Sequence, residues 1–157
     1  MSALSKIFKL TNYTALLAWL VLSTLPLWPN QIQGIPPLNL VMGIIIFLLC
    51  VAYTYLVFLG KKHDDPNHKV RGSFWSLKGI INLFKTPRVV LAGWVHYLAF
   101  DLMVGIYILN DAAQYNISHW LLLPCLFLTL MFGPAGLFAY LLLRFAMTGD
   151  YFAGAVL

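Results

Sequence analysis

Two side chains that can transfer protons, His96 and Asp101, lie in one of the most apolar stretches of this chain, GWVHYLAFDL from Gly93 to Leu102. An aspartate at the centre of a bilayer costs at least about 2.5 kcal/mol even on lenient insertion scales. A low-dielectric environment favours the neutral form of both groups, so a protonated Asp101 could donate a proton and a neutral His96 could accept one near pH 7. The two residues are therefore the candidate catalytic acid and base.

Their spacing does not predict a contacting pair. Residues five apart project about 140° from one another on a helix. Asp101 shares one helical stripe with Trp94, Tyr97 and Gly105, whereas His96 shares another with Phe100, Met103 and Tyr107. We expect the Asp101 stripe to face other helices, and Trp94 and Tyr97 to be substrate contacts. An alternative stays open, in which both polar residues only form hydrogen bonds between helices.

The elements that must position these residues follow from composition. Hydrophobic residues make up 61% of the 157 residues and charged residues only 10%, against about 25% in an ordinary soluble domain. Four apolar segments reach the roughly 20 residues that cross a bilayer, at 11–28, 38–60, 89–109 and 119–147. We predict an all-α integral membrane four-helix bundle, forming one domain over 1–157. Gly133 and Pro134 predict a kink in the fourth span.

The basic residues predict an orientation. With four spans, all ten Lys and Arg, from Lys6 to Arg144, fall on one side, and the short loops of the other side carry only Asp111. The positive-inside rule then places both termini and the loop 61–88 in the cytoplasm. The first span could instead be a signal peptide, but no small-x-small cleavage site follows it before Pro26. A net charge of +5 on so apolar a chain indicates anionic lipid headgroups as partners rather than nucleic acid.

The loop 61–88 has two parts. The first holds metal-ligand types, namely His63, Asp64, Asp65 and His68, but their spacing matches no compact zinc motif, so we expect a solvated loop and no bound metal. In the second part, apolar residues recur at helical spacing with lysines beside them. These are Phe74, Leu77, Ile80, Ile81 and Phe84, with Lys78 and Lys85. This pattern predicts a short helix in the cytoplasmic interface.

Two segments carry a resemblance to a known family. VVLAGWVHYLAFDLMVG and LLLPCLFLTLMFGPAGLFAYLLLR closely resemble bacterial members of the abscisic-acid-deficient-4-like family, named after a plant plastid membrane protein required for neoxanthin formation. The most specific part is W-x-H-x-L-A-x-D-L, from Trp94 to Leu102. The resemblance covers about Leu10 to Met147. It implies a bacterial plasma or thylakoid membrane protein of carotenoid metabolism, with His96 and Asp101 as site residues.

The implied chemistry is an isomerisation. Converting a ring epoxide to an allenic alcohol delivers a proton to the epoxide oxygen and removes one from the adjacent polyene carbon, with no net redox change and no obligatory cofactor or metal. The ligand would be a carotenoid or a similar isoprenoid lipid. Two other classes compete: a non-enzymatic membrane scaffold or accessory subunit, and a transporter, for which no inverted repeat is evident.

Overall fold

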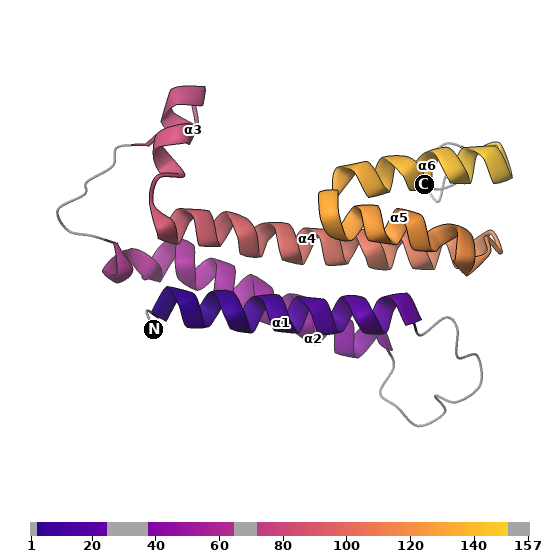
Figure 1. The fold of residues 1–157 in the computed structure, drawn as a ribbon, viewed down its shortest axis with the longest axis horizontal. Helices are drawn as coiled ribbons and strands as arrows, with labels where there is room; N and C mark the ends of the chain where they lie inside the picture. Colours follow the sequence, from indigo (N-terminus) through magenta and orange to yellow (C-terminus); the bar gives the residue numbers. More distant parts are fainter. Residues whose placement is uncertain (1–2, 25–37, 65–71, 151–157) are drawn as a thin grey trace. The chain divides into compact units, whose positions relative to one another are not determined.

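The computed structural model describes residues 3–24, 38–64 and 72–150. Within these ranges the chain is all-α. Six α-helices follow one another: α1 (Ala3–Thr24), α2 (Leu38–Thr54), α3 (Leu77–Leu83), α4 (Pro87–Gln114), α5 (His119–Phe132) and α6 (Pro134–Thr148). Figure 1 shows their course along the chain.

Three of the described helices are long and apolar enough to cross a membrane. They are Ala3–Thr24, Leu40–His63 and Pro87–Gln114, with 22, 24 and 28 residues. Hydroxyl groups inside these helices bond to backbone one turn back, as Thr11 does to the Ile7 carbonyl at 2.9 Å and Thr14 to the Leu10 carbonyl at 2.9 Å. Such local bonds satisfy polar side chains where lipid offers no partner. The three long apolar helices indicate an integral membrane protein.

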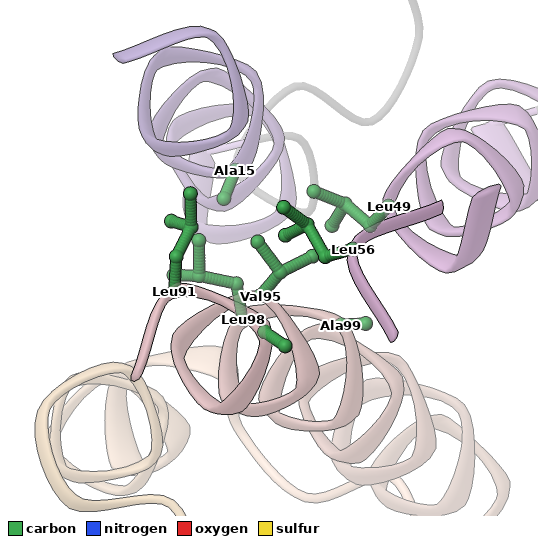
Figure 2. Packing of buried hydrophobic residues seen from close by; sticks show 8 residues of the cluster. Ala15, Leu49, Leu56, Leu91, Val95, Leu98 and Ala99 are labelled. Carbon is green, nitrogen blue, oxygen red and sulfur yellow. The ribbon is translucent and has the colours of Figure 1, made fainter. Parts of the chain in front are cut away.

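The described chain divides into two compact units. The first unit comprises residues 1–15 and 43–99, and its core joins α1, α2 and the first half of α4. Figure 2 shows the apolar side chains of this core pointing toward one another from the three helices. Its fully buried members include Leu56 and Val95, and the alanines Ala15 and Ala99 lie among them. Small residues between larger ones let helix backbones approach closely.

The C-terminal end of α2 is fixed to the start of α4. Beyond Thr54 the helix widens into a π-helical turn, η2 (Tyr55–Leu59), and then tightens into a 3-10 turn, η3 (Gly60–His63). A π-helical turn displaces backbone carbonyls from their regular partners. Here the Leu56 carbonyl accepts a hydrogen bond from Arg88 Nη1 at 2.7 Å. The same guanidinium makes a two-point ion pair with Asp64, with Nε–Oδ1 and Nη2–Oδ2 distances of 2.9 Å.

The second unit comprises residues 16–42 and 100–157, of which 16–24, 38–42 and 100–150 are described. Here α5 and α6 lie side by side and antiparallel (Figure 1). The chain reverses at Gly133, whose φ of 48° belongs to the left-handed region that glycine adopts without a side-chain clash. Pro134 then takes the first position of α6, where its missing N–H costs nothing.

This hairpin corrects the prediction of one kinked span over 119–147. Instead there are two helices of 14 and 15 residues, each about 21 to 23 Å long at 1.5 Å per residue. Neither reaches the roughly 30 Å of a hydrocarbon core by itself. The other predicted spans correspond to α1, to α2 with its extension, and to α4, although residues 25–37, between α1 and α2, lie outside the described ranges.

Candidate functional site

His96 lies on α4 in the first unit, with its side chain exposed. Its imidazole ring packs at an angle of 46° against the ring of Tyr53, with 5.6 Å between centroids. Tyr53 itself is partly buried against the core of this unit. The imidazole is therefore held from one side by an aromatic ring and accessible from the other, as a group that meets a ligand must be.

Trp94 and Tyr97 form a stacked aromatic pair on the same part of α4. Their ring centroids are 5.5 Å apart and the rings are inclined by only 25°. The indole Nε1 of Trp94 donates a hydrogen bond to Asn12 Oδ1 at 3.1 Å, and the Asn12 amide donates to the Phe8 carbonyl at 2.7 Å. These bonds fix the indole, which nevertheless keeps 42% of its surface exposed.

An apolar groove runs beside Trp94 within the first unit. It has a volume of about 590 Å³, and its walls come from the first turns of α1 and of α4. The lining residues are Leu4, Ser5, Phe8, Lys85, Pro87, Val90, Leu91 and Trp94. Apart from Ser5, Lys85 and the indole N–H of Trp94, these side chains are apolar. The groove has a size and polarity suited to a hydrocarbon ligand.

Asp101 belongs to the second unit, so it has a different set of neighbours from His96. Its side chain is only 6% exposed. The carboxylate packs against the reversal of the hairpin: a Cβ added at Gly133 would lie 2.5 Å from Asp101 Oδ1. Gly133 directly precedes α6, so the carboxyl group of Asp101 lies beside the start of that helix. In the helical stripe that Asp101 was predicted to share with Trp94 and Gly105, Asp101 and Gly105 are thus buried, whereas Trp94 is exposed.

A buried polar cluster holds the far end of α4 against α6. Arg144 is fully buried, and its Nε lies 2.8 Å from Asp111 Oδ2. The hydroxyl of Tyr140, also fully buried, donates a hydrogen bond to the same carboxylate oxygen. On the opposite side Arg144 Nη1 donates to the Asp150 carbonyl at 2.8 Å. One carboxylate therefore receives a cation and a hydroxyl, which offsets much of the cost of removing both charges from water.

Aromatic rings enclose this cluster. The Arg144 guanidinium lies 4.4 Å from the centroid of the Tyr115 ring, which places the cation over the aromatic face. Tyr107 meets Tyr140 edge to face at 6.3 Å. Arg144 thus lies beside Asp111, near the C-terminal end of α4.

The metal-ligand types of the long loop have other partners. His63 Nε2 and the Tyr55 hydroxyl are hydrogen-bonded at 3.0 Å, and Asp64 pairs with Arg88. Asp65 and His68 lie outside the described residues. Across 3–24, 38–64 and 72–150, no three His, Cys, Asp or Glu side chains gather where they could hold a metal ion.

Comparison with known proteins identifies the family. The family model described as ABA DEFICIENT 4-like matches residues 6–140. The chain belongs to the ABA DEFICIENT 4-like family. This confirms the family indicated by the Trp94 to Leu102 motif. No curated protein and no solved structure matches the chain. The matched range of the family model includes His96, Asp101, Asp111 and Tyr140, and ends four residues before Arg144.

In this family member, the sequence contained a signal for the buried cluster that span counting obscured. Tyr107, Asp111 and Tyr115 follow one another at intervals of four, and so do Tyr140 and Arg144. Residues four apart lie on one face of a helix, so each helix presents a polar and aromatic face that is complementary to the other. Assigning Asp111 and Arg144 to opposite membrane faces kept the two halves of this pattern apart.

Proposed function

We propose that this membrane protein binds an elongated isoprenoid lipid, such as a carotenoid, and isomerises it by acid–base chemistry. The apolar groove beside Trp94 is the observation that carries the proposal. A polyene presents flat, apolar faces, and stacking on a fixed indole and the neighbouring Tyr97 ring suits such a face. Membership in the ABA DEFICIENT 4-like family supports the choice of ligand, because the resemblance of this chain to that family implies a role in forming neoxanthin.

The reaction that we propose is the conversion of a ring epoxide to an allenic alcohol. The C–O bond of the epoxide opens and its oxygen gains a proton, while the adjacent polyene carbon loses a proton and becomes part of the allene. Atoms and electrons balance without an oxidant or reductant. Asp101 in its protonated form is the proposed donor to the oxygen, and neutral His96 is the proposed acceptor from carbon.

The exposed imidazole of His96 supports its assignment as the acceptor, since a base has to reach the proton it removes. The burial of Asp101 supports its assignment as a carboxylic acid that keeps its proton, since a carboxylate is costly in an apolar environment. Trp94 and Tyr97 are proposed as ligand contacts, with no chemical role.

A pigment-binding experiment tests the binding step. The full chain is expressed in a carotenoid-producing host and purified in detergent, and bound pigment is extracted and quantified by chromatography. Trp94→Ala is expected to lower the bound pigment at least severalfold. Trp120→Ala is the matched control, because Trp120 is also exposed, at 69%, but does not line the groove. Equal pigment in both variants contradicts the groove as the binding site.

A conversion assay tests the reaction. The protein in lipid nanodiscs receives violaxanthin, and the appearance of neoxanthin is followed by chromatography. His96→Ala and Asp101→Asn are each expected to abolish conversion while pigment binding stays. Loss of binding in the same variants would instead indicate that these residues hold the fold or the ligand.

A non-enzymatic scaffold remains the second candidate, and one observation favours it. Asp101 is buried directly against Gly133. This position suits a side chain that forms hydrogen bonds between helices better than a reactive group that a ligand must reach. This candidate predicts that Asp101→Asn, which keeps the shape and hydrogen-bonding capacity of the side chain, is tolerated. It also predicts that the protein purifies in fixed stoichiometry with a larger membrane complex.

A further inference from the structure

The segment from Phe74 to Lys85, which contains α3, exposes an unusual amount of apolar surface. Trp75 is 97% exposed and Phe74 is 80% exposed. Leu77, Ile81 and Phe84 add further exposed apolar side chains. Ser76 begins the helix by accepting a hydrogen bond from the Gly79 N–H at 3.1 Å, so the segment is locally ordered. Several large apolar side chains exposed on one short segment indicate a place that meets lipid or another molecule.

The position of the segment along the chain identifies lipid as what it meets. α3 ends at Leu83 and the 28-residue membrane-spanning helix α4 begins at Pro87. Four residues of chain reach at most about 14 Å. The segment is therefore tied to the level at which the hydrocarbon core gives way to headgroups. Tryptophan is enriched at that level, because its ring is apolar and its N–H is polar.

The charge of the segment identifies the kind of lipid. No acidic residue occurs between Asp65 and Asp101, and this stretch contains five Lys and Arg. Arg88 is engaged with Asp64, whereas Lys78 and Lys85 have exposed side chains. Lys85 also lines the apolar groove. Exposed lysines on an apolar segment next to a membrane-spanning helix fit the phosphates of anionic headgroups.

We infer that residues 74–85 form a recognition site for anionic phospholipid headgroups, in which Lys78 and Lys85 contact phosphate and Trp75 inserts among the lipids. Each lysine close to an anionic surface contributes roughly a fivefold preference for anionic over zwitterionic lipid. The site does not depend on which lipid the protein modifies, so it holds whether or not the proposed isomerisation is correct.

Quenching by brominated lipids tests this inference on the full chain. The protein is placed in nanodiscs containing equal amounts of phosphatidylglycerol and phosphatidylcholine, with bromine on the acyl chains of one lipid or the other. The contribution of Trp75 is the difference in quenching between the wild type and Trp75→Phe. We expect this contribution to be quenched severalfold more by brominated phosphatidylglycerol. Lys78→Gln with Lys85→Gln is expected to remove the preference, as is 0.5 M salt.

Lys61→Gln with Lys62→Gln is the matched control, since it removes two exposed charges from the same loop outside the segment. The preference is expected to persist in it. Quenching of Trp75 by neither lipid overturns the inference, because the segment would then be in water or covered by a protein partner. Equal quenching by both lipids overturns the headgroup preference. The lysine comparison is made on total tryptophan emission as well, so it does not require Trp75→Phe to fold.

Discussion

Arg144 and Asp111 form an ion pair between α6 and α4, with 2.8 Å between Nε and Oδ2 and both side chains withdrawn from solvent. Tyr140 reinforces the pair by donating to the same carboxylate oxygen. A regular kinked span over 119–147 would have carried Arg144 away from Asp111. The ion pair and the reversal at Gly133 are thus two consequences of one arrangement, the folding of α6 back along α5.

The ion pair between Arg144 and Asp111 is expected to stabilise the fold, because removal of one partner leaves the other charge buried without its counter-charge. Arg144→Gln leaves the Asp111 carboxylate buried without its cation, and we expect the free energy of unfolding to fall by about 1–3 kcal/mol. Asp111→Asn should lower the free energy of unfolding by a similar amount, and the double variant should lower it by clearly less than the sum of the two single changes. Denaturant unfolding in detergent, followed by circular dichroism, measures all three. Strict additivity of the two changes would show that the groups do not interact.

The hairpin of α5 and α6 predicts that the end of α4 and the end of α6 are accessible from the same side of the membrane. Gln114→Cys and Asp150→Cys, each in a variant without Cys50 and Cys125, should react with a membrane-impermeant maleimide from the same side of the membrane. Both positions are exposed. Four full spans require the opposite result, with the two cysteines reacting from opposite sides. Labelling after permeabilisation is the control that both cysteines are reactive.

Gly133→Ala is expected to destabilise the second unit for two separable reasons. A φ of 48° costs a residue with a side chain about 1–2 kcal/mol, and the new Cβ also meets the Asp101 carboxylate. Gly149→Ala is the matched control, because Gly149 has a φ of 76° but nothing within 4 Å of the added Cβ. The measured difference between the two variants contains the contact with Asp101 together with the effect of the different ψ angles, −97° at Gly133 and −6° at Gly149. Combining Gly133→Ala with Asp101→Ala should recover the part due to the contact, and failure to recover any of it would exclude the contact as a cause.

Gly105 is expected to tolerate no side chain, whereas Gly43 should accept one. A Cβ at Gly105 would lie 2.8 Å from Trp19 Cη2, so Gly105→Ala should lower the melting temperature as the indole is displaced. A Cβ at Gly43, inside α2, meets nothing within 4 Å. Gly43→Ala should therefore raise the stability by about 0.5–1 kcal/mol through the lower backbone entropy of the unfolded chain. Thermal unfolding of both variants checks the two opposite signs.

The sequence was sufficient for the long helices and the family, because both depend on local information. Hydropathy located α1, α2 and α4, and the motif from Trp94 to Leu102 indicated the family that the comparison then showed. The hairpin could not be predicted in this way. A glycine followed by a proline is compatible with both a kink and a reversal, and only the backbone conformation at Gly133 distinguishes them.

The same distinction between local and long-range information applies to the candidate site. Helical spacing predicts that His96 and Asp101 project from different faces of α4, and the structure assigns the two residues to different units. Spacing did not determine which stripe of α4 would be covered, because both stripes combine aromatic and small or apolar residues with one polar group. His96 has Tyr53 as its ring neighbour and Asp101 has Gly133 beside its carboxyl group, and both neighbours are far away in sequence.

The two-point contact of Arg88 with Asp64 has a consequence for how this protein can change. It clamps together two positions that are 24 residues apart, next to a carbonyl that the π-helical turn has released. Because this contact brings the two positions together, the length of the chain between them has little effect on the free energy of folding. Doubling the length of a flexible loop costs only about 0.6 kcal/mol. A peptide added to the chain between Asp64 and α3, by evolution or as an experimental epitope, should therefore leave the contact of Arg88 with Asp64 in place.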